Sequence, residues 1–223
     1  MSQNKTGYIE IENISFGYGK GPDLFNNLSL GLDKDEITVL LGENGSGKTT
    51  LAKLVMGMLD PRSGRIMLDG VRVEDLALGE VGMKVGYLFQ NPDHQIFGAT
   101  LIDQLLWSFE FLGEDIDLAK GKAEELIRLF GLEGSRDTYP YYLSLGEKRI
   151  LALASVLMRS PDYLILDEPT SSLDEERAGV LKEVLKRLSE RGIGMLIITH
   201  DEGLSDSLGH RMIRLSEGRV ENV

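Results

Sequence analysis

Apolar and polar residues alternate along the first forty positions of the chain. The segments YIEIENISFGYG and NLSLGLDKDEITVLLG consist of short apolar runs between Gly, Asp and Asn residues, which is typical of β-strands joined by turns. Over residues 48–59, KTTLAKLVMGML, the apolar positions change to a helical period. The segment SGRIMLDG then predicts a strand closed by an Asp-Gly turn, and KVGYLFQ predicts a strand that ends at Gln90.

The pattern from Pro92 to about residue 160 is mainly helical, in the segments ATLIDQLLWSFEFLG, LAKGKAEELIRLFGL and LSLGEKRILALASVLMRS. After it come the apolar strand YLILDE, a helix over EERAGVLKEVLKRLSERG and the apolar strand IGMLIITH. Strands that are apolar throughout and alternate with helices predict a mostly parallel sheet covered on both faces. We therefore expect an α/β fold in which residues 92–160 form a helical subdomain.

The composition excludes several classes of function. The 223 residues include 24 Lys and Arg against 36 Asp and Glu, and the net charge of −12 disfavours a broad basic surface for nucleic acid while leaving a local basic patch open. Because there is no cysteine, disulfides, thiolate metal sites and cysteine nucleophiles are excluded. No signal-type apolar run occurs in MSQNKTGYIEIENISF, and no segment approaches about 20 consecutive apolar residues. We expect a soluble, cytoplasmic chain.

The segment GENGSGKT, residues 42–49, fits the pattern G-x-x-x-x-G-K-[ST] between a predicted strand and a predicted helix. The alternative is a Gly-rich turn without function. Backbone N–H groups of residues 44–49 can point into one concavity at a helix N-terminus, where phosphates are favoured. Lys48 adds a charge for the β and γ phosphates, and Thr49 a hydroxyl for Mg²⁺. We predict a nucleoside triphosphate site made by Gly42, Asn44, Gly45, Ser46, Gly47, Lys48, Thr49 and Thr50.

The segment YLILDE has the form of a buried strand whose end reaches the ligand crevice of a parallel sheet. Taken alone, it is equally well explained as a strand that ends in an acidic turn. Together with GENGSGKT, it predicts that Asp167 holds Mg²⁺ and that Glu168 accepts a proton from water attacking the γ phosphate. The pair of motifs is therefore compatible with hydrolysis of a nucleoside triphosphate and not only with its binding.

The segment LSLGE has two interpretations. Ser144 and Glu147 are spaced as a capping box ahead of the apolar run ILALASVLM, so the segment can be a helix start. It can also be an altered phosphate-binding site, because a helix N-terminus offers free N–H groups. The two interpretations are compatible, since one geometry serves both.

These motifs resemble those of the ATP-binding-cassette (ABC) ATPases, and the resemblance covers nearly the whole chain. LSLGE stands in the place of that family's Leu-Ser-Gly-Gly-Gln signature, SSLD in that of its D-loop, and ITH in that of its switch histidine. The resemblance implies a P-loop NTPase fold with a mostly parallel sheet core and an N-terminal antiparallel β part. It implies one domain over residues 1–223, with the core in 1–91 and 161–223 and an inserted helical subdomain in 92–160.

The resemblance also implies roles for single residues. Tyr18 matches the aromatic residue that stacks on adenine, although an ordinary strand tyrosine is the alternative. His200 would contact the γ phosphate and position the attacking water. Gln90 would reach Mg²⁺ and the water while joining the sheet to the helical subdomain. Glu168, His200 and Gln90 make the expected catalytic set, and Thr49, Gln90 and Asp167 make the expected metal set.

Cassettes of this family close head to tail, so that each ATP lies between one chain's P-loop and the other chain's signature. The resemblance therefore implies that the partner's ATP meets Ser144, Gly146, Glu147 and Asp174. Leu145 departs from the family, which usually has a glycine there, and Ile150 stands where an arginine often follows. We hypothesise an asymmetric heterodimer in which this chain supplies an altered signature to one of two ATP sites.

The segment QNPDHQIFGATLIDQL looks like the corresponding stretch of energy-coupling-factor importers and related cobalt or nickel importers. That resemblance implies an integral membrane partner, vitamin or metal-ion import, and a peripheral location on the inner face of the cell membrane. The nearby Phe97, Trp107, Phe109 and Phe111 would form a groove for a helix of the membrane partner, or else belong to the subdomain core. The chain stops soon after RMIRLSEGRV, whereas many of those cassettes carry a C-terminal extension.

Two other functions stay open at this point. One is a soluble cassette ATPase of assembly or repair, such as the iron-sulfur cluster type; the chain has no room for the long coiled coil of the chromosome-maintenance type. The other is a regulatory cassette that binds ATP without useful turnover. The presence of Lys48, Asp167, Glu168 and His200 argues against the regulatory cassette.

Overall fold

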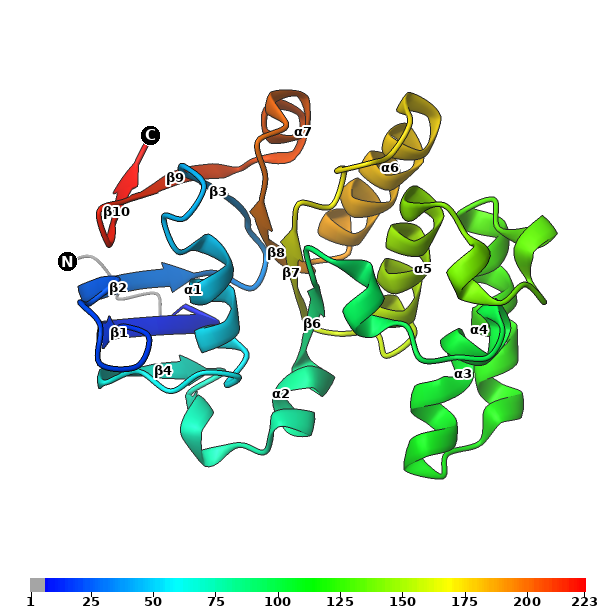
Figure 1. The fold of residues 1–223 in the computed structure, drawn as a ribbon, viewed down its shortest axis with the longest axis horizontal. Helices are drawn as coiled ribbons and strands as arrows, with labels where there is room; N and C mark the ends of the chain where they lie inside the picture. The colour runs from blue at the N-terminus through cyan, green and yellow to red at the C-terminus, as the bar shows by residue number, and fades with distance from the viewer. Residues whose placement is uncertain (1–6) are drawn as a thin grey trace.

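The computed structural model describes residues 7–223, so the N-terminal segment considered above for a signal-type run lies partly outside the described residues. Near the N-terminus the chain forms a four-stranded antiparallel sheet of order β2-β1-β4-β5 (Figure 1). Its strands are β1 (Ile9–Phe16), β2 (Phe25–Leu32), β4 (Ser63–Leu68) and β5 (Val71–Arg72). The predicted Asp-Gly turn joins β4 to β5, and both residues have positive φ, 53° at Asp69 and 78° at Gly70.

The second sheet has six strands in the order β10-β9-β3-β8-β7-β6. Neighbouring strands are parallel from β6 through β7, β8 and β3 to β9, and only the edge strand β10 is antiparallel. The α/β class and the mostly parallel core are therefore confirmed. The strands are β3 (Ile37–Leu41), β6 (Val85–Leu88), β7 (Tyr163–Asp167), β8 (Gly194–Ile198), β9 (Arg211–Ser216) and β10 (Arg219–Asn222).

Two hydrophobic cores lie on opposite faces of the parallel sheet. Tyr163 and Ile165 of β7 pack into the core shared with the antiparallel sheet and with α1 (Lys48–Val55). The alternate residues Leu164 and Leu166 pack into the core shared with the helices beyond the sheet. Because successive side chains of a strand point to opposite faces, a strand buried on both sides is apolar throughout. This explains why YLILDE and IGMLIITH show no polar alternation.

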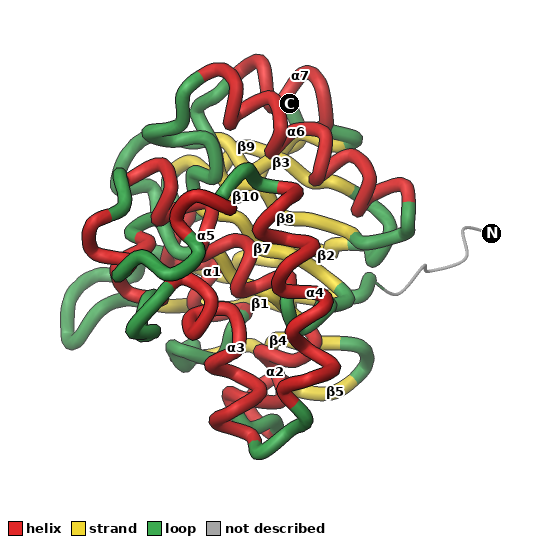
Figure 2. Tube along the Cα trace, turned by 90° about the vertical axis from the view of Figure 1, so that its right-hand side faces the viewer, coloured by secondary structure: helices red, strands yellow, loops and turns green. Residues whose placement is uncertain are grey.

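The far face of the sheet is covered by helices, which lie on the right of Figure 1 and toward the viewer in Figure 2. The core on this face contains side chains of α3, α4 and α5 together with those of β7, β8 and α6. The helices on this face are α3 (Leu101–Leu112), α4 (Ile116–Leu129), α5 (Leu145–Leu157), α6 (Glu175–Glu190) and α7 (Glu202–Leu208), whereas α2 (Leu78–Lys84) packs Val81 into the core on the other face. The division into a core and a 92–160 subdomain stays a prediction.

Two predicted element ends are wrong, each for a local reason. The helix predicted over 48–59 ends at Val55, because Gly57 has a φ of 67° and its N–H donates to Leu54 O while Met58 N donates to Lys53 O. The strand predicted to reach Gln90 ends at Leu88, because the Gln95 side chain forms hydrogen bonds with the backbone groups at the end of this strand. Gln95 accepts from Phe89 N at 2.8 Å and donates to Tyr87 O at 2.7 Å.

No helix of residues 7–223 combines the length and the apolar composition needed to cross a membrane.

Candidate functional site

A cavity of about 700 Å³ opens at the edge of the parallel sheet where the strands have their carboxyl ends. The register of the parallel strands brings the residues after β3, β6, β7 and β8 to this edge, which is the usual ligand crevice of an open α/β sheet. Of the residues predicted from the sequence, the structure brings the following to its walls: Tyr18, Asn44, Gly45, Gly47, Lys48, Thr49, Thr50, Gln90, Asp167, Glu168 and His200.

Two glycines of the loop between β3 and α1 are required by their surroundings. A Cβ at Gly42, which has a φ of 152°, would lie 2.5 Å from Leu215 O. A Cβ at Gly47, which has a φ of 104° and caps α1, would lie 2.8 Å from the ring of Phe25. Since real Cβ atoms do not approach so closely, the loop can take this path only with glycine at both positions. The path leaves the start of α1 open toward the cavity.

The Lys48 side chain crosses the inside of this loop. Its Nζ donates to Gly42 O at 2.7 Å and to Glu43 O at 2.9 Å, and the residue is 8% exposed. Burial lowers the pKa of Lys48, while the nearby carboxylates of Glu168 and Asp167 act in the opposite direction. Both acceptors are neutral carbonyls, so an anion entering the cavity would offer this ammonium group a stronger partner.

Thr49 and Asp167 meet across the base of the cavity. The Thr49 hydroxyl donates to Asp167 Oδ2 at 2.6 Å, although the two residues are 118 positions apart. Burial raises the pKa of the Asp167 carboxyl, and the hydrogen bond from Thr49 and the charge of Lys48 oppose that rise. No group of three His, Cys, Asp or Glu residues suited to a metal occurs within residues 7–223. Thr49 and Asp167 fit a hard cation that takes its other ligands from phosphate and water.

Glu168 and His200 face each other at the mouth of the same cavity. His200 Nε2 lies 3.5 Å from Glu168 Oε1. Glu168 follows directly after β7 and has a left-handed φ of 52°, which is uncommon outside glycine. Its N–H donates to Ile198 O at 2.8 Å, which links the end of β7 to the end of β8. The arrangement places an acid and an imidazole together beside the Thr49–Asp167 pair.

Tyr18 lines the cavity from the loop that follows β1 of the antiparallel sheet. Its hydroxyl and that of Thr50 are 2.9 Å apart, and its ring contacts Phe16 edge-on at 5.1 Å between centroids. The side chain is nevertheless 57% exposed, so a ring face is available for an aromatic ligand such as a nucleobase.

Gly42 and Ser46 do not line this cavity; they line a neighbouring hollow of about 1220 Å³ beside β9. The prediction that the N–H groups of residues 44–49 converge is altered at Ser46, because its N–H donates to Glu43 O at 3.2 Å within the loop turn. Lining residues that the motifs did not indicate are Pro22, Asp23 and Leu24. They follow Tyr18 in an irregular loop, and no motif of the sequence signals them.

The predicted signature segment lies apart from this cavity, at the N-terminus of α5. Ser144 is the N-cap residue, and its backbone N–H and hydroxyl donate to Glu147 Oε2 at 2.9 and 2.7 Å. Glu147 N donates back to Ser144 Oγ at 3.3 Å, so the capping-box interpretation is confirmed. These bonds lower the pKa of Glu147, with the Ser144 hydroxyl as the largest cause.

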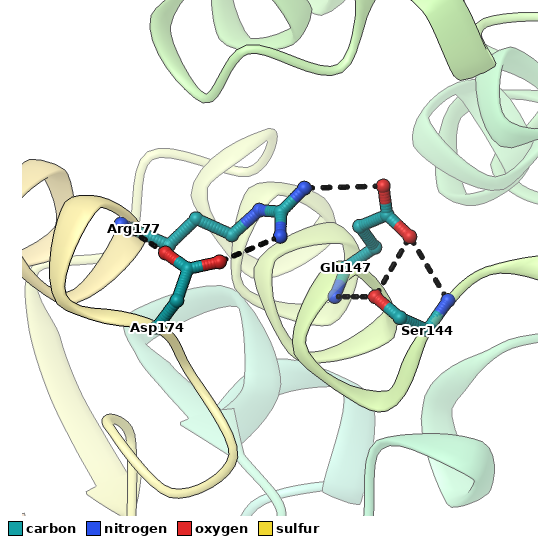
Figure 3. A network of polar contacts seen from close by, with 4 residues as sticks. All are labelled: Ser144, Glu147, Asp174 and Arg177. Carbon is teal, nitrogen blue, oxygen red and sulfur yellow. Dashed lines mark hydrogen bonds and ion pairs between the residues drawn. The ribbon is translucent and has the colours of Figure 1, made fainter.

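Arg177 joins this capping box to the start of α6. Figure 3 shows its guanidinium between the carboxylates of Asp174 and Glu147. Nη1 lies 2.9 Å from Asp174 Oδ2, Nη2 lies 3.2 Å from Glu147 Oε1, and Asp174 caps α6 by accepting from Arg177 N at 2.8 Å. Sequence reasoning missed Arg177, because a charged residue in the first turn of an amphipathic helix is ordinarily solvated.

Gly146 packs the signature segment against the predicted D-loop. A Cβ at this position would lie 2.8 Å from Ser172 O, so the close approach of α5 to this loop depends on glycine. Leu145, at the first helical position, is 48% exposed and does not have a positive φ. The leucine in place of the family's glycine therefore causes no backbone strain, and its side chain extends from the surface at the start of α5.

The chain belongs to the ABC transporter family, whose sequence profile matches residues 25–171. It is 37% identical over 213 residues to a putative ABC transporter ATP-binding protein of Pyrococcus furiosus, which covers 96% of the chain and 82% of that relative. It is also 37% identical over 195 residues to the energy-coupling factor transporter ATP-binding protein EcfA1 of Oceanobacillus iheyensis, covering 86% of the chain and 70% of that protein.

Solved structures share the fold. CbiO1 from Clostridium perfringens, part of the ABC transporter complex CbiONQ, matches with a TM-score of 0.84 and 28% identity over 97% of the chain and 88% of its own. An ATP-binding cassette solved as a dimer in a post-hydrolysis state with ADP and Pi matches with a TM-score of 0.85 and 25% identity over 96% of both chains. The protein is accordingly an ATP-binding ATPase of the ABC type. It spans only 36%, 48% and 37% of the length of three other relatives.

We predict that Lys48→Ala abolishes measurable ATP binding. The variant removes the ammonium group held inside the P-loop, which is the charged donor proposed for the β and γ phosphates. Lys53→Ala is a matched control, because Lys53 lies on the same helix but does not line the cavity. Titration with a fluorescent ATP analogue should show weak or no binding only for Lys48→Ala, and an unchanged affinity would contradict this role.

Proposed function

We propose that the protein powers a membrane importer by hydrolysing ATP, as the cassette of an energy-coupling-factor type system for vitamins or metal ions. The observation that carries the hydrolytic part is the placement of Glu168 and His200 beside the Thr49–Asp167 pair in one cavity. The importer part is supported by the relative EcfA1 and by the fold neighbour CbiO1, which is part of a transporter complex.

In the proposed site, the triphosphate lies along the loop of residues 42–49 and the adenine ring rests on Tyr18. Lys48 exchanges the carbonyls of Gly42 and Glu43 for β and γ phosphate oxygens. Thr49 and Asp167, with Gln90 at the same wall, would hold Mg²⁺. When bound, that ion neutralises charge on the β and γ phosphates.

Glu168 is the proposed general base. Its carboxylate lies at the cavity mouth, where it can accept the proton of a water molecule that attacks the γ phosphorus as the bond to the bridging oxygen breaks. His200, 3.5 Å away, is placed to donate a hydrogen bond to the γ phosphate and to keep the carboxylate directed at the water. Gln90 would orient the same water from the end of β6.

The signature segment would act on a second cassette. Ser144, Gly146, Glu147 and Asp174 do not line the cavity of this chain, as expected for residues that would meet the ATP of a partner. A solved relative of the fold is a dimer. We propose a pair of different cassettes, because Leu145 places an exposed apolar side chain where close contact with the partner's nucleotide is expected.

An exposed aromatic stack on α3 is the proposed contact with an integral membrane protein. Trp107 stacks on Phe111 at 5.1 Å and contacts Phe97 at 5.5 Å, and the three side chains are 40–73% exposed. Phe109 is excluded from the stack, because it is partly buried against the core and Arg159 lies over its ring at 4.5 Å. An apolar helix of the membrane partner fits such a surface, which would hold the protein on the inner face of the cell membrane.

We predict that Glu168→Gln keeps ATP affinity and lowers turnover by at least about 10²-fold, because the amide cannot accept the proton. The variant should accumulate as a closed dimer with ATP, visible by size-exclusion chromatography. Glu190→Gln removes an exposed acid at the end of α6, outside the cavity lining, and as a control should keep normal turnover. Hydrolysis by Glu168→Gln at the parental rate would remove Glu168 from its proposed role.

We predict that Trp107→Ser combined with Phe111→Ser prevents co-purification with integral membrane proteins while leaving ATP affinity unchanged. Both side chains lie outside the ATP cavity, so the loss would report contact with the partner. Val71→Ser, which alters an exposed apolar residue of the antiparallel sheet, is the control. Recovery of the parental chain only with proteins of an assembly scaffold would contradict transport and favour the assembly ATPase.

We predict that Leu145→Gly raises ATP turnover at the site facing the signature of this chain and leaves its own site unchanged. Removing the side chain makes room for the partner's nucleotide, whereas Leu145→Met keeps the bulk and should keep the parental rate. Turnover of each site can be separated by pairing either variant with a partner whose own general base is removed. Equal rates for Leu145→Gly and the parental chain would remove the basis for asymmetry.

A further inference from the structure

Arg149 is a buried charged residue near the start of α5, only 3% exposed. Its Nη1 donates to Glu168 O at 2.8 Å, and its Nη2 donates to Gln90 O at 2.9 Å. Gln90 and Glu168 follow the neighbouring strands β6 and β7, whose last paired residues are Leu88 and Leu166. The guanidinium therefore bridges two proposed reacting residues from behind, through their backbone carbonyls.

The hydrogen bond from Arg149 is made to a residue, Glu168, whose backbone has a strained left-handed conformation. A left-handed conformation is unfavourable for a non-glycine residue and persists only where surrounding contacts hold it. At Glu168 those contacts lie on both sides of the residue: its N–H is bonded to Ile198 O, and its carbonyl accepts from Arg149. Ser171 N also donates to this carbonyl, at 3.2 Å. Without Arg149, the peptide that follows Glu168 loses its shorter hydrogen bond and the carboxylate loses its fixed direction.

The chemistry of Arg149 suits two acceptors at once. A planar guanidinium presents parallel N–H groups in a fixed fork, whereas a lysine ammonium is a single point of charge on a flexible stem. Its acceptors here are two neutral carbonyls, and the ion pairs formed within residues 7–223 include none with Arg149. A buried charge whose hydrogen bonds go only to neutral carbonyls, with the Glu168 and Asp167 carboxylates nearby but not in direct contact, is a costly way to attach a helix to a sheet, since apolar packing would do so at lower cost.

The position of Arg149 on α5 connects two parts of the proposed mechanism. Ser144, the N-cap of the same helix, belongs to the segment that would meet the partner's ATP. Arg149 lies five residues further along, so a displacement of the N-terminal turn of α5 also displaces the guanidinium and the two carbonyls that it holds.

We propose that Arg149 is a positioning residue for ATP hydrolysis, which fixes Gln90 and Glu168 at the cavity edge and ties their placement to α5. The inference rests on the proposed function, in which Gln90 and Glu168 orient and deprotonate the attacking water. Arg149 does not line the cavity and touches no reactant. Its effect therefore falls on the alignment of the reacting groups and not on the binding of ATP.

The test compares Arg149→Met and Arg149→Lys in the full chain assembled with its partner cassette. A misplacement of reacting groups by about 1 Å costs on the order of 10²-fold in rate. We expect Arg149→Met to lose about that factor in kcat with an unchanged Kd for ATP. Arg149→Lys, which can reach one carbonyl at a time, should recover part of kcat. A change in Kd and thermal midpoint with parental kcat would assign Arg149 a structural role only and overturn the proposal.

Arg159→Met is the matched control for loss of a largely buried arginine. Arg159 follows α5, pairs with Glu114 at 2.7 Å and lies outside the ATP cavity, so its loss should lower the thermal midpoint without lowering kcat. If Arg149→Met does not fold, the kcat of Arg149→Lys is the deciding measurement. A kcat equal to that of the parental chain would overturn the proposal.

Glu168→Gln, measured in parallel, distinguishes a failure of the Arg149 proposal from a failure of the proposed function. An inactive Glu168→Gln with a fully active Arg149→Met would overturn the role of Arg149 and leave the proposed function intact. An active Glu168→Gln would remove the proposed base, while kcat of Arg149→Met would still show whether Arg149 aligns the site through Gln90.

Discussion

The parallel register of β6, β7, β8 and β3 is the constraint on which the site depends. It brings four strand ends to one edge, where β3 leads into the P-loop and where Gln90, Glu168 and His200 lie one or two residues beyond the ends of β6, β7 and β8. Apart from Thr38 and the terminal Asp167, the buried residues of these strands are apolar, so a strand that slipped along its neighbours would move core residues out of their apolar surroundings. The hydrophobic effect thus fixes the sheet, and the sheet fixes the distances between acid, hydroxyl and imidazole.

The polar groups at this edge are held mostly by backbone contacts. Lys48 is held by two carbonyls of its own loop, and Glu168 by Ile198 and Arg149. The Lys48 side chain, which would bind the triphosphate, is held by neutral carbonyls. These are weaker partners than phosphate oxygens, so a triphosphate can replace them. The site is therefore ordered before ATP enters, which reduces the entropy lost on binding and on reaching the transition state.

Two regions of the surface are the proposed contacts with other proteins, and α5 connects them to the ATP cavity. Its N-terminus carries the Ser144–Glu147 capping box, its flank meets the sheet through Arg149, and α3 packs beside it with the aromatic stack of Trp107 and Phe111. A movement of this helix relative to the sheet would reach the reacting residues and the proposed membrane contact together. Because α5 contacts both regions, ATP hydrolysis at the cavity can be coupled to a movement at the proposed membrane contact.

The sequence by itself determined whatever depends on neighbouring residues: the strand and helix types, the glycines of the P-loop, and the capping box at Ser144. It also indicated most of the cavity wall, because those residues follow directly after recognisable strands. It misplaced the ends at Val55 and Leu88, where a C-terminal glycine motif and the Gln95 side chain stop the elements. Only the tertiary structure decided the Thr49–Asp167 bond, the approach of Gly146 to Ser172, and the contacts of Arg149 and Arg177. These pairs are far apart in the chain, and their distances follow from how the sheet and helices pack, which no local pattern encodes.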